Sequence, residues 1–381
     1  MAGSRTDQEP WDRRIGTLAL LIVGHLLLAV LILPQLPARD GYLDRYQVLH
    51  EATGRPYRDF EVEYPPVLII VVDAVAGDTE PATAWRLVFL SLAAEAALVL
   101  LLYRDRGRET ATRYLALTLP LVPFFVATLD IVSVTLCVSS VVLCRRNRER
   151  VGGTIFALAI LTKVWPIVLV PGLLVTGHRR ALRWCLAALI SGMIAWIVWG
   201  GVSGPWQVIS ARGAPGWEIE STIGSIVWAL GGHVAYVQDS PRTGFIPVWA
   251  APLLVVLLIM TLVAVWRRCM KRPPEAWGSA SLAAVCSLLA ASPVLSYPYA
   301  TWIAPWGAAA DPDGPWFRLS LSITTCTALF MLALSQGTHP LLIWTALLAR
   351  NALVLIVVVR YLVPTGRLMP ARKQPRQSPR R

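Results

Sequence analysis

Long apolar runs recur along the whole chain, and their length limits what it can fold into. A transmembrane helix needs about 20 consecutive apolar residues, because that length crosses the hydrocarbon core of a bilayer. Hydrophobic residues make up 55% of the 381 positions, and charged residues only 15%. The pattern predicts an all-α polytopic membrane protein with about 12 transmembrane helices. The expected spans are residues 15–36, 83–103, 111–128, 131–144, 151–163, 166–177, 181–201, 246–266, 276–292, 297–310, 316–335 and 340–362.

Positive charge is concentrated in short clusters between these apolar runs. The clusters are residues 104–108, 145–150, 179–183, 267–272 and the tail 367–381. Lys and Arg accumulate in cytoplasmic loops of membrane proteins, so these clusters predict which loops face the cytoplasm. The net charge of +12 therefore indicates membrane topology rather than a nucleic-acid partner. The tail is also suited to contact anionic membrane lipid.

This topology divides the chain into three parts. We expect a cytoplasmic N-terminus at residues 1–14, a transmembrane domain at 15–366 and a basic cytoplasmic tail at 367–381. Two larger loops, about 37–82 and 202–244, are expected on the extracytoplasmic face of the cell membrane. Residues 64–77 are apolar but too short to cross, so they fit a re-entrant or interfacial segment. The chain has no GxGxxG or Walker sequence, which argues against a nucleotide-binding domain.

The first outer loop is rich in acids: residues 37–66 hold six carboxylates and four arginines. Unpaired charges are too costly in lipid, so the loop must meet water beside the membrane. Asp40 and Asp44 are four residues apart and share a face if the segment is helical. A carboxylate there suits a general base that takes a proton from an attacking hydroxyl. The alternative is that both acids solvate the loop or pair with Arg39 and Arg45.

Two ionisable residues interrupt apolar runs near the same outer face. Asp130 ends the run FFVATLD, and Lys163 lies inside ALAILTKVWPIVLVP. An ionisable group at membrane depth is a functional candidate, and a lysine is suited to hold a phosphate as a point charge. The alternatives are that Lys163 snorkels or pairs with Asp130, and that Asp130 is an interfacial helix end.

The second outer loop and a later aromatic segment supply further candidates. Arg212 precedes GWEIES, in which Glu218, Glu220 and Ser221 are suited to bind sugar hydroxyls, unless the loop is simply solvated. Tyr297 and Tyr299 belong to the later segment, where aromatic rings form either an interface belt or a surface for a sugar or prenyl chain. The five histidines show no metal-ligand spacing, so we predict neither a metal site nor a cofactor.

Taken in order along the chain, these segments resemble glycosyltransferase family 87, whose members are polyprenyl-phosphate-sugar-dependent enzymes of the GT-C fold, typified by mannosyltransferases. The matching pieces are Asp40, PYRDFEVEYPP at 56–66, LD at 129–130, LTKVWP at 161–166, IES at 219–221, and SP with SYPYATWIAP in 292–305. The resemblance implies a GT-C-like helical bundle. It makes Asp40 the expected base, ahead of Asp44. Arg58, Glu63, Tyr64 and Asp130 become candidate substrate-binding residues, together with Glu220, Ser221, Tyr297 and Tyr299.

The resemblance implies transfer of a sugar, with mannose expected, from a polyprenyl-phosphate donor to an extracytoplasmic glycolipid or glycan. Lys163 is the expected contact for the departing phosphate. Arg212 is a second candidate, because Pro215 stands where the family has an arginine. Direct displacement would invert the anomeric centre. Two alternatives remain open: a flippase or transporter of lipid-linked sugars, and an inactive partner in a cell-envelope synthesis complex.

Overall fold

The structure is a computed structural model that describes residues 11–32, 41–126, 128–210, 215–237 and 240–363. The α-helices are α1 (Trp11–Ile32), α2 (Gly41–Glu51), α3 (Pro66–Val75), α4 (Glu80–Arg106), α5 (Arg108–Thr118), α6 (Val122–Phe125), α7 (Asp130–Arg145), α8 (Glu149–Thr162), α9 (Val170–Val175), α10 (Arg179–Gly200), α11 (Ser203–Ser210), α12 (Thr222–Ala229), α13 (Ala250–Met270), α14 (Ser281–Ala291), α15 (Ala304–Ala309), α16 (Trp316–Ser335) and α17 (Pro340–Leu362). Short helical turns are η2 (Leu119–Leu121), η3 (Trp165–Leu169), η5 (Pro273–Glu275), η6 (Ala276–Ala280) and η7 (Tyr297–Trp302). The strands are β1 (Trp217–Glu218), β2 (Val234–Val237) and β3 (Ser240–Thr243).

Five of the described helices are long and apolar enough to cross a membrane, namely α4, α10, α13, α16 and α17. The chain is therefore a helical membrane protein, but the structure does not confirm about a dozen spans. Several expected spans are shorter, broken helices. Prolines explain part of this: Pro120 and Pro123 lie where α5, η2 and α6 follow one another, and proline cannot continue a helical hydrogen-bond ladder. The apolar segment at 64–77 forms only the ten-residue helix α3, as expected.

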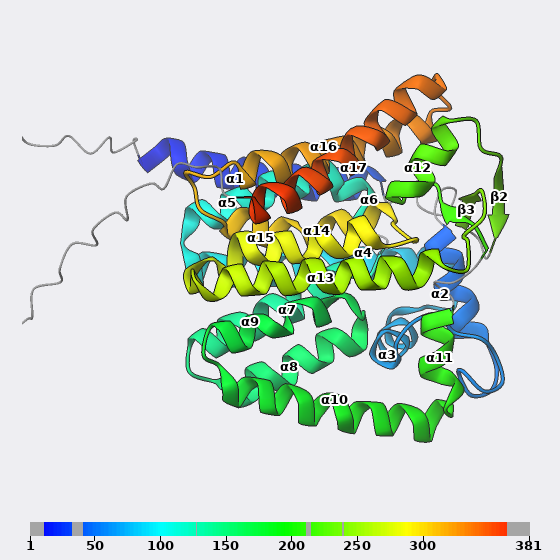
Figure 1. The fold of residues 1–381 in the computed structure, drawn as a ribbon, viewed down its shortest axis with the longest axis horizontal. Coiled ribbons are helices and arrows are strands. Elements are labelled where there is room, and N and C mark those ends of the chain that lie inside the picture. The colour runs from blue at the N-terminus through cyan, green and yellow to red at the C-terminus, as the bar shows by residue number, and fades with distance from the viewer. Residues whose placement is uncertain (1–10, 33–40, 127, 211–214, 238–239, 364–381) are drawn as a thin grey trace, which may run out of the picture.

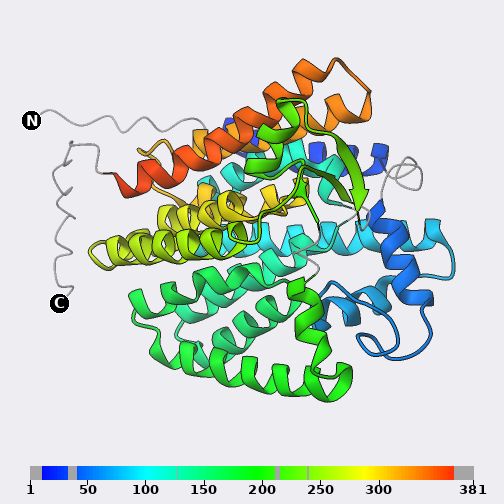
Figure 2. The same cartoon turned by 45° about the vertical axis from the view of Figure 1, so that its right-hand side comes forward.

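The two ends of the helical bundle differ in chemistry (Figure 1). The end on the left holds the arginine clusters, where α4 and α7 finish and α10 begins. There Arg145 Nη1 lies 2.6 Å from Asp105 Oδ2 and ties α7 to α4. The end on the right carries α2, α11 and the β-strands. Figure 2 shows α8 and α10 at one edge of the molecule, with α16 and α17 at the opposite edge.

The first outer loop is fixed onto the ends of α10 and α11 through Tyr57. Its ring lies 5.4 Å from Trp196, centroid to centroid, and its hydroxyl donates to the Tyr64 carbonyl at 2.6 Å. Gly200 is required at this contact, because a Cβ there would lie 2.6 Å from the Tyr57 ring. Gln207 on α11 also donates to the Tyr57 carbonyl, at 2.8 Å. The PYRDF segment is therefore held in place by ring packing and by hydrogen bonds from side chains to backbone carbonyls.

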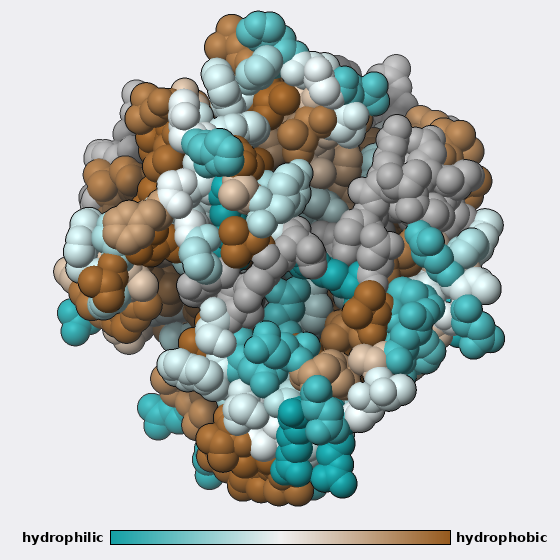
Figure 3. Space-filling view, turned by 90° about the vertical axis from the view of Figure 1, so that its right-hand side faces the viewer, coloured by the Kyte–Doolittle hydropathy of each residue, from teal (hydrophilic) through white to brown (hydrophobic). Residues whose placement is uncertain are grey.

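The second outer loop folds into a small ribbon and a helix. The strands pair antiparallel in the order β1–β3–β2, with Glu218 directly opposite Arg242. Ser221 begins α12 by accepting a hydrogen bond from the Gly224 amide at 3.0 Å, as an N-cap residue does. Figure 3 views this end of the molecule directly. Hydrophilic residues gather in its lower centre, and hydrophobic residues lie to the left of them and below them.

Candidate active site

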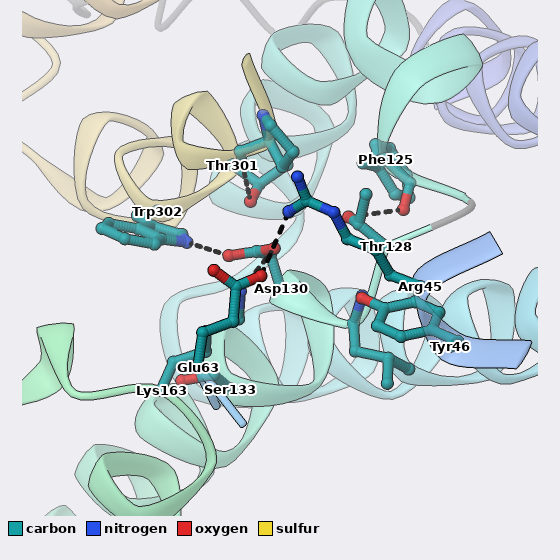
Figure 4. Close-up of polar contacts among 12 residues, drawn as sticks. Arg45, Tyr46, Glu63, Phe125, Thr128, Asp130, Ser133, Lys163, Thr301 and Trp302 are labelled. Atoms are coloured by element: carbon teal, nitrogen blue, oxygen red, sulfur yellow. Dashed lines mark hydrogen bonds and ion pairs between the residues drawn. The ribbon is translucent and has the colours of Figure 1, made fainter. Parts of the chain in front are cut away.

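Segments far apart in the sequence meet around Asp130 at this end of the bundle (Figure 4). Asp130 is the first residue of α7, where a carboxylate is favoured by the helix dipole. Its Oδ2 lies 3.3 Å from Lys163 Nζ, and its Oδ1 accepts a hydrogen bond from Trp302 Nε1 at 2.8 Å. Both charged side chains are buried. The ion pair between Asp130 and Lys163, which the sequence left open as an alternative to a functional role for Lys163, is therefore present.

Lys163 lies immediately after α8, where the backbone becomes extended. Its Nζ is 5.2 Å from the centre of the Tyr64 ring and 6.0 Å from that of Tyr299. Rings at these distances stabilise a cation. An ammonium has three donors, and within the described residues its only polar contact is the one with Asp130. Lys163 thus keeps donor capacity for a ligand oxygen.

Three aromatic rings form a stack beside this ion pair. The Tyr299 and Trp302 centroids are 4.1 Å apart, and those of Trp165 and Trp302 are 5.1 Å apart. The same three residues line an apolar pocket of about 880 Å³. Leu254 and Leu258 of α13 also line it. The charged pair therefore sits at the border of a cavity suited to a hydrocarbon chain.

Helix α2 brings the first outer loop to the same place. The Leu129 amide donates to the Tyr46 hydroxyl at 3.4 Å, which joins α2 to the residue before Asp130. Arg45 Nη1 donates to Glu63 Oε1 at 3.1 Å. Asp44 belongs to α2, although its side chain lies outside what the structure describes, and so does the whole of Asp40. Asp44 therefore belongs to an element that packs against the site, and Asp40 precedes that element in the sequence.

The other sequence candidates lie in varied surroundings. Glu220 is buried and pairs with Arg350, and Ser221 caps α12. Arg58 is exposed and donates to the Val198 carbonyl at 3.2 Å. Tyr297 packs edge-on against Phe124, with ring centroids 6.0 Å apart. Arg212 lies outside the described residues.

Arg242 is a buried cation that sequence reasoning missed. It lies on β3, and its Nη1 donates to the Gly216 carbonyl at 3.1 Å. Burial lowers the pKa of its guanidinium, while the charges of Glu218, Glu63 and Tyr299 oppose that shift. The pairing of β1 with β3 places Arg242 directly opposite Glu218. No sequence signal distinguished it, because an arginine in SPRTG reads as part of a solvated loop.

The described residues contain no group of three or more His, Cys, Asp or Glu side chains that could hold a metal ion.

The sequence model of glycosyltransferase family 87 matches residues 63–293, which is more than half of the chain. The matched region begins at Glu63 and includes Asp130, Lys163 and the β-ribbon. No curated protein matches the sequence.

Proposed function

Because the chain belongs to glycosyltransferase family 87, it is a membrane glycosyltransferase, and we propose that its donor is a sugar carried on a polyprenyl phosphate. The observation that carries this proposal is the Asp130–Lys163 pair at the border of the apolar pocket. A prenyl chain requires an apolar cavity, and its phosphate requires a cation at the mouth of that cavity. The expected sugar is mannose, and the expected acceptor is a glycolipid or glycan.

The reaction is a direct displacement. Asp40, or Asp44 four residues later, takes the proton of an acceptor hydroxyl, whose oxygen attacks the anomeric carbon of the donor sugar. The bond from that carbon to the phosphate oxygen breaks, and the prenyl phosphate leaves as an anion. Lys163 is placed to stabilise the negative charge that grows on the phosphate. One displacement inverts the anomeric centre.

The site is proposed to face the extracytoplasmic side of the cell membrane. It lies at the opposite end of the bundle from the arginine clusters, which are expected to be cytoplasmic. Nucleotide sugars are cytoplasmic, so a lipid-linked sugar is the donor available on the other face. Residues 1–14 and 367–381 are accordingly expected in the cytoplasm.

The donor and the base are tested together in isolated membranes supplied with labelled polyprenyl-phosphate mannose. The Asp40→Asn variant keeps the shape of the side chain and loses its basicity. Transfer should fall by about 10²–10⁴-fold, the usual contribution of general-base catalysis. A nucleotide sugar should give no transfer when it is offered in place of the lipid donor.

Asp44→Asn is the matched comparison, since it makes the same change four residues along. Full activity in Asp40→Asn with loss in Asp44→Asn would move the base to Asp44. If a nucleotide sugar supported as much transfer as polyprenyl-phosphate mannose, the proposed lipid-linked donor would be rejected.

Orientation is tested by single cysteines at the exposed positions Thr53 and Arg148. An impermeant thiol reagent applied to intact cells should label the first and not the second, because only the first outer loop is expected outside. The unsubstituted chain gives the background from its own six cysteines. Labelling at position 148 alone would reverse the orientation and remove the argument for a lipid-linked donor.

A further inference from the structure

Helix α2 is short and owes its position to tertiary contacts. It has only 11 residues, and an isolated helix shorter than about 12–15 residues is marginal in water. It packs against α3 and α4. Leu43 and Tyr46 are each only 1% exposed, and both belong to one buried apolar cluster. Burial of apolar surface is non-directional, so it holds α2 against the bundle without fixing the rotation of the helix about its own axis.

The half-buried side chain of Gln47 supplies directional contacts between α2 and the start of α4. Its Oε1 accepts a hydrogen bond from the Thr83 hydroxyl at 2.8 Å, and its Nε2 donates to the Gly77 carbonyl at 3.2 Å. Nε2 also donates to Glu51 Oε1 at 2.7 Å, one turn further along α2. Hydrogen bonds depend on angle as well as distance. Because both polar ends of one amide reach residues outside α2, they fix the rotation and the register of the helix.

The surface to which Gln47 binds is itself well held. Thr83 is fully buried, and its hydroxyl accepts a hydrogen bond from the Gly77 amide at 2.8 Å. Among the acceptors in reach of that hydroxyl, Gln47 Oε1 at 2.8 Å is closer than the carbonyls of Thr79 at 3.2 Å and Gly77 at 3.4 Å. Gly77 has no room for a side chain, because a Cβ there would lie 2.9 Å from that of Ala82. The turn between α3 and α4 therefore offers Gln47 partners in fixed positions.

The same helix reaches the candidate active site. The Tyr46 hydroxyl accepts a hydrogen bond from the Leu129 amide at 3.4 Å, directly before Asp130 (Figure 4). Asp44 belongs to α2, and Asp40 immediately precedes it in the sequence. A rotation or shift of α2 would therefore move the backbone that carries Asp44 and that follows Asp40.

We propose that Gln47 is a positioning residue for sugar transfer: its hydrogen bonds to the α3–α4 turn set how α2, and with it the base, faces the donor phosphate. This inference rests on the proposed function, because the base belongs to the proposed displacement. Gln47 acts only through the helix, and the base alone takes the proton. A misplacement of about 1 Å caused by a change away from the chemistry can lower a rate about 100-fold, so the contact matters for turnover.

The test compares turnover with donor binding. Gln47→Met keeps the length of the side chain and removes its hydrogen bonds. Turnover at saturating polyprenyl-phosphate mannose, measured per amount of folded protein, should fall about 10–100-fold. Equilibrium binding of radiolabelled decaprenyl phosphate to the purified full chain in detergent should not change, because no described residue of α2 lines the apolar pocket. If turnover stays at the wild-type value, or falls only together with the binding of decaprenyl phosphate, the inference fails.

Two further variants control for the substitution itself. Gln336→Met makes the same change at an exposed glutamine directly after α16 and should behave like wild type. Thr83→Val breaks the contact with Gln47 from its other side with little change in shape. Because the two residues share one contact, the loss in the double variant should be smaller than the product of the two single losses. Losses that multiply would mean that the residues act separately, which contradicts the inference.

A variant without the base separates positioning from general support of the fold. Whichever of Asp40→Asn and Asp44→Asn loses most of the transfer identifies the base. Adding Gln47→Met to that variant should cause little further loss, because the contribution of the base is already absent. If the addition lowers the remaining transfer by the same factor as in the wild type, Gln47 does not act through the base and the inference fails. If neither aspartate variant loses transfer, the proposed function loses its base, and the inference falls with it.

Discussion

The Glu220–Arg350 pair and the Asp130–Lys163 pair are both buried, but their hydrogen-bonding capacity is filled to different extents. Arg350 Nη1 donates to Glu220 Oε2 at 2.8 Å, its Nη2 donates to the Glu220 carbonyl, and its Nε donates to Asn351 Oδ1 at 3.1 Å. Asn351 Nδ2 in turn donates to the Ser221 carbonyl at 3.3 Å and to Ser225 Oγ at 2.9 Å. This network joins the start of α12 to α17. Within it, each nitrogen of the Arg350 guanidinium donates a hydrogen bond.

The Asp130–Lys163 pair makes fewer hydrogen bonds than the Glu220–Arg350 pair. Its two atoms are 3.3 Å apart, and the lysine is otherwise surrounded by the Tyr64 and Tyr299 rings. Asp130 is held by one strong hydrogen bond, from Trp302. A buried polar group with spare capacity is costly unless something else meets it. The comparison therefore favours a structural role for the first pair and supports the proposed ligand-binding role of the second.

The largest effect is expected from breaking the filled pair. Arg350→Met leaves Glu220 buried without its cation, and breaking one partner of a buried pair costs about 3–5 kcal/mol. The free energy of unfolding should fall by that amount, which would appear as a lower thermal midpoint and a lower folded yield in detergent. Arg360→Met changes an exposed arginine on the same helix and should behave like wild type. Wild-type stability in Arg350→Met would contradict the structural role.

A smaller effect, on turnover, is expected from Lys163→Met. The substitution keeps most of the apolar stem and removes the charge, but it also leaves the buried Asp130 without its cation, so turnover is compared per amount of folded protein. Turnover should fall about 10²–10³-fold, the usual loss when one group that stabilises transition-state charge is removed. Lys271→Met, at an exposed lysine near the other end of the bundle, is the matched control.

The same variant separates the ligand-binding role from a purely structural one. If Lys163 only neutralises Asp130, the double variant Asp130→Asn with Lys163→Met should recover the activity lost in either single change. The activity of the double variant is measured as labelled sugar transferred in isolated membranes. If that activity recovers, both buried pairs have a structural role only.

The smallest effect is expected from Trp302→Phe. It removes the indole hydrogen bond to Asp130 and leaves an aromatic ring in the stack with Tyr299 and Trp165. A hydrogen bond to a charged group contributes about 1.5–3 kcal/mol, so transfer should fall about 10–150-fold. Trp306→Phe makes the same change where the indole nitrogen has no hydrogen-bond partner among the described residues, and it should have little effect. Equal losses in the two variants would mean that ring packing, not Asp130, matters.

The sequence by itself determined the helical membrane class and several of the helices. The spans expected at 316–335 and 340–362 coincide with α16 and α17, and the short segment at 64–77 forms α3. Apolar length is a local property of the sequence, and lipid leaves the backbone no other way to satisfy its hydrogen bonds than a helix or a closed barrel. The motifs between Asp40 and residue 305 also supported the family, which the match over residues 63–293 confirmed.

Only the tertiary structure decided which polar residues meet. The sequence suggested that Lys163 might pair with Asp130, but it gave no sign that Trp302 would hold the other carboxylate oxygen. It also gave no sign that Arg350 would form an ion pair with Glu220. Nor did it indicate that Arg242 would lie opposite Glu218 in a β-ribbon. These partners lie far apart in the chain, and an apolar pattern specifies that helices pack without specifying their register or rotation. That packing decides which buried charged groups fill their hydrogen-bonding capacity and which do not.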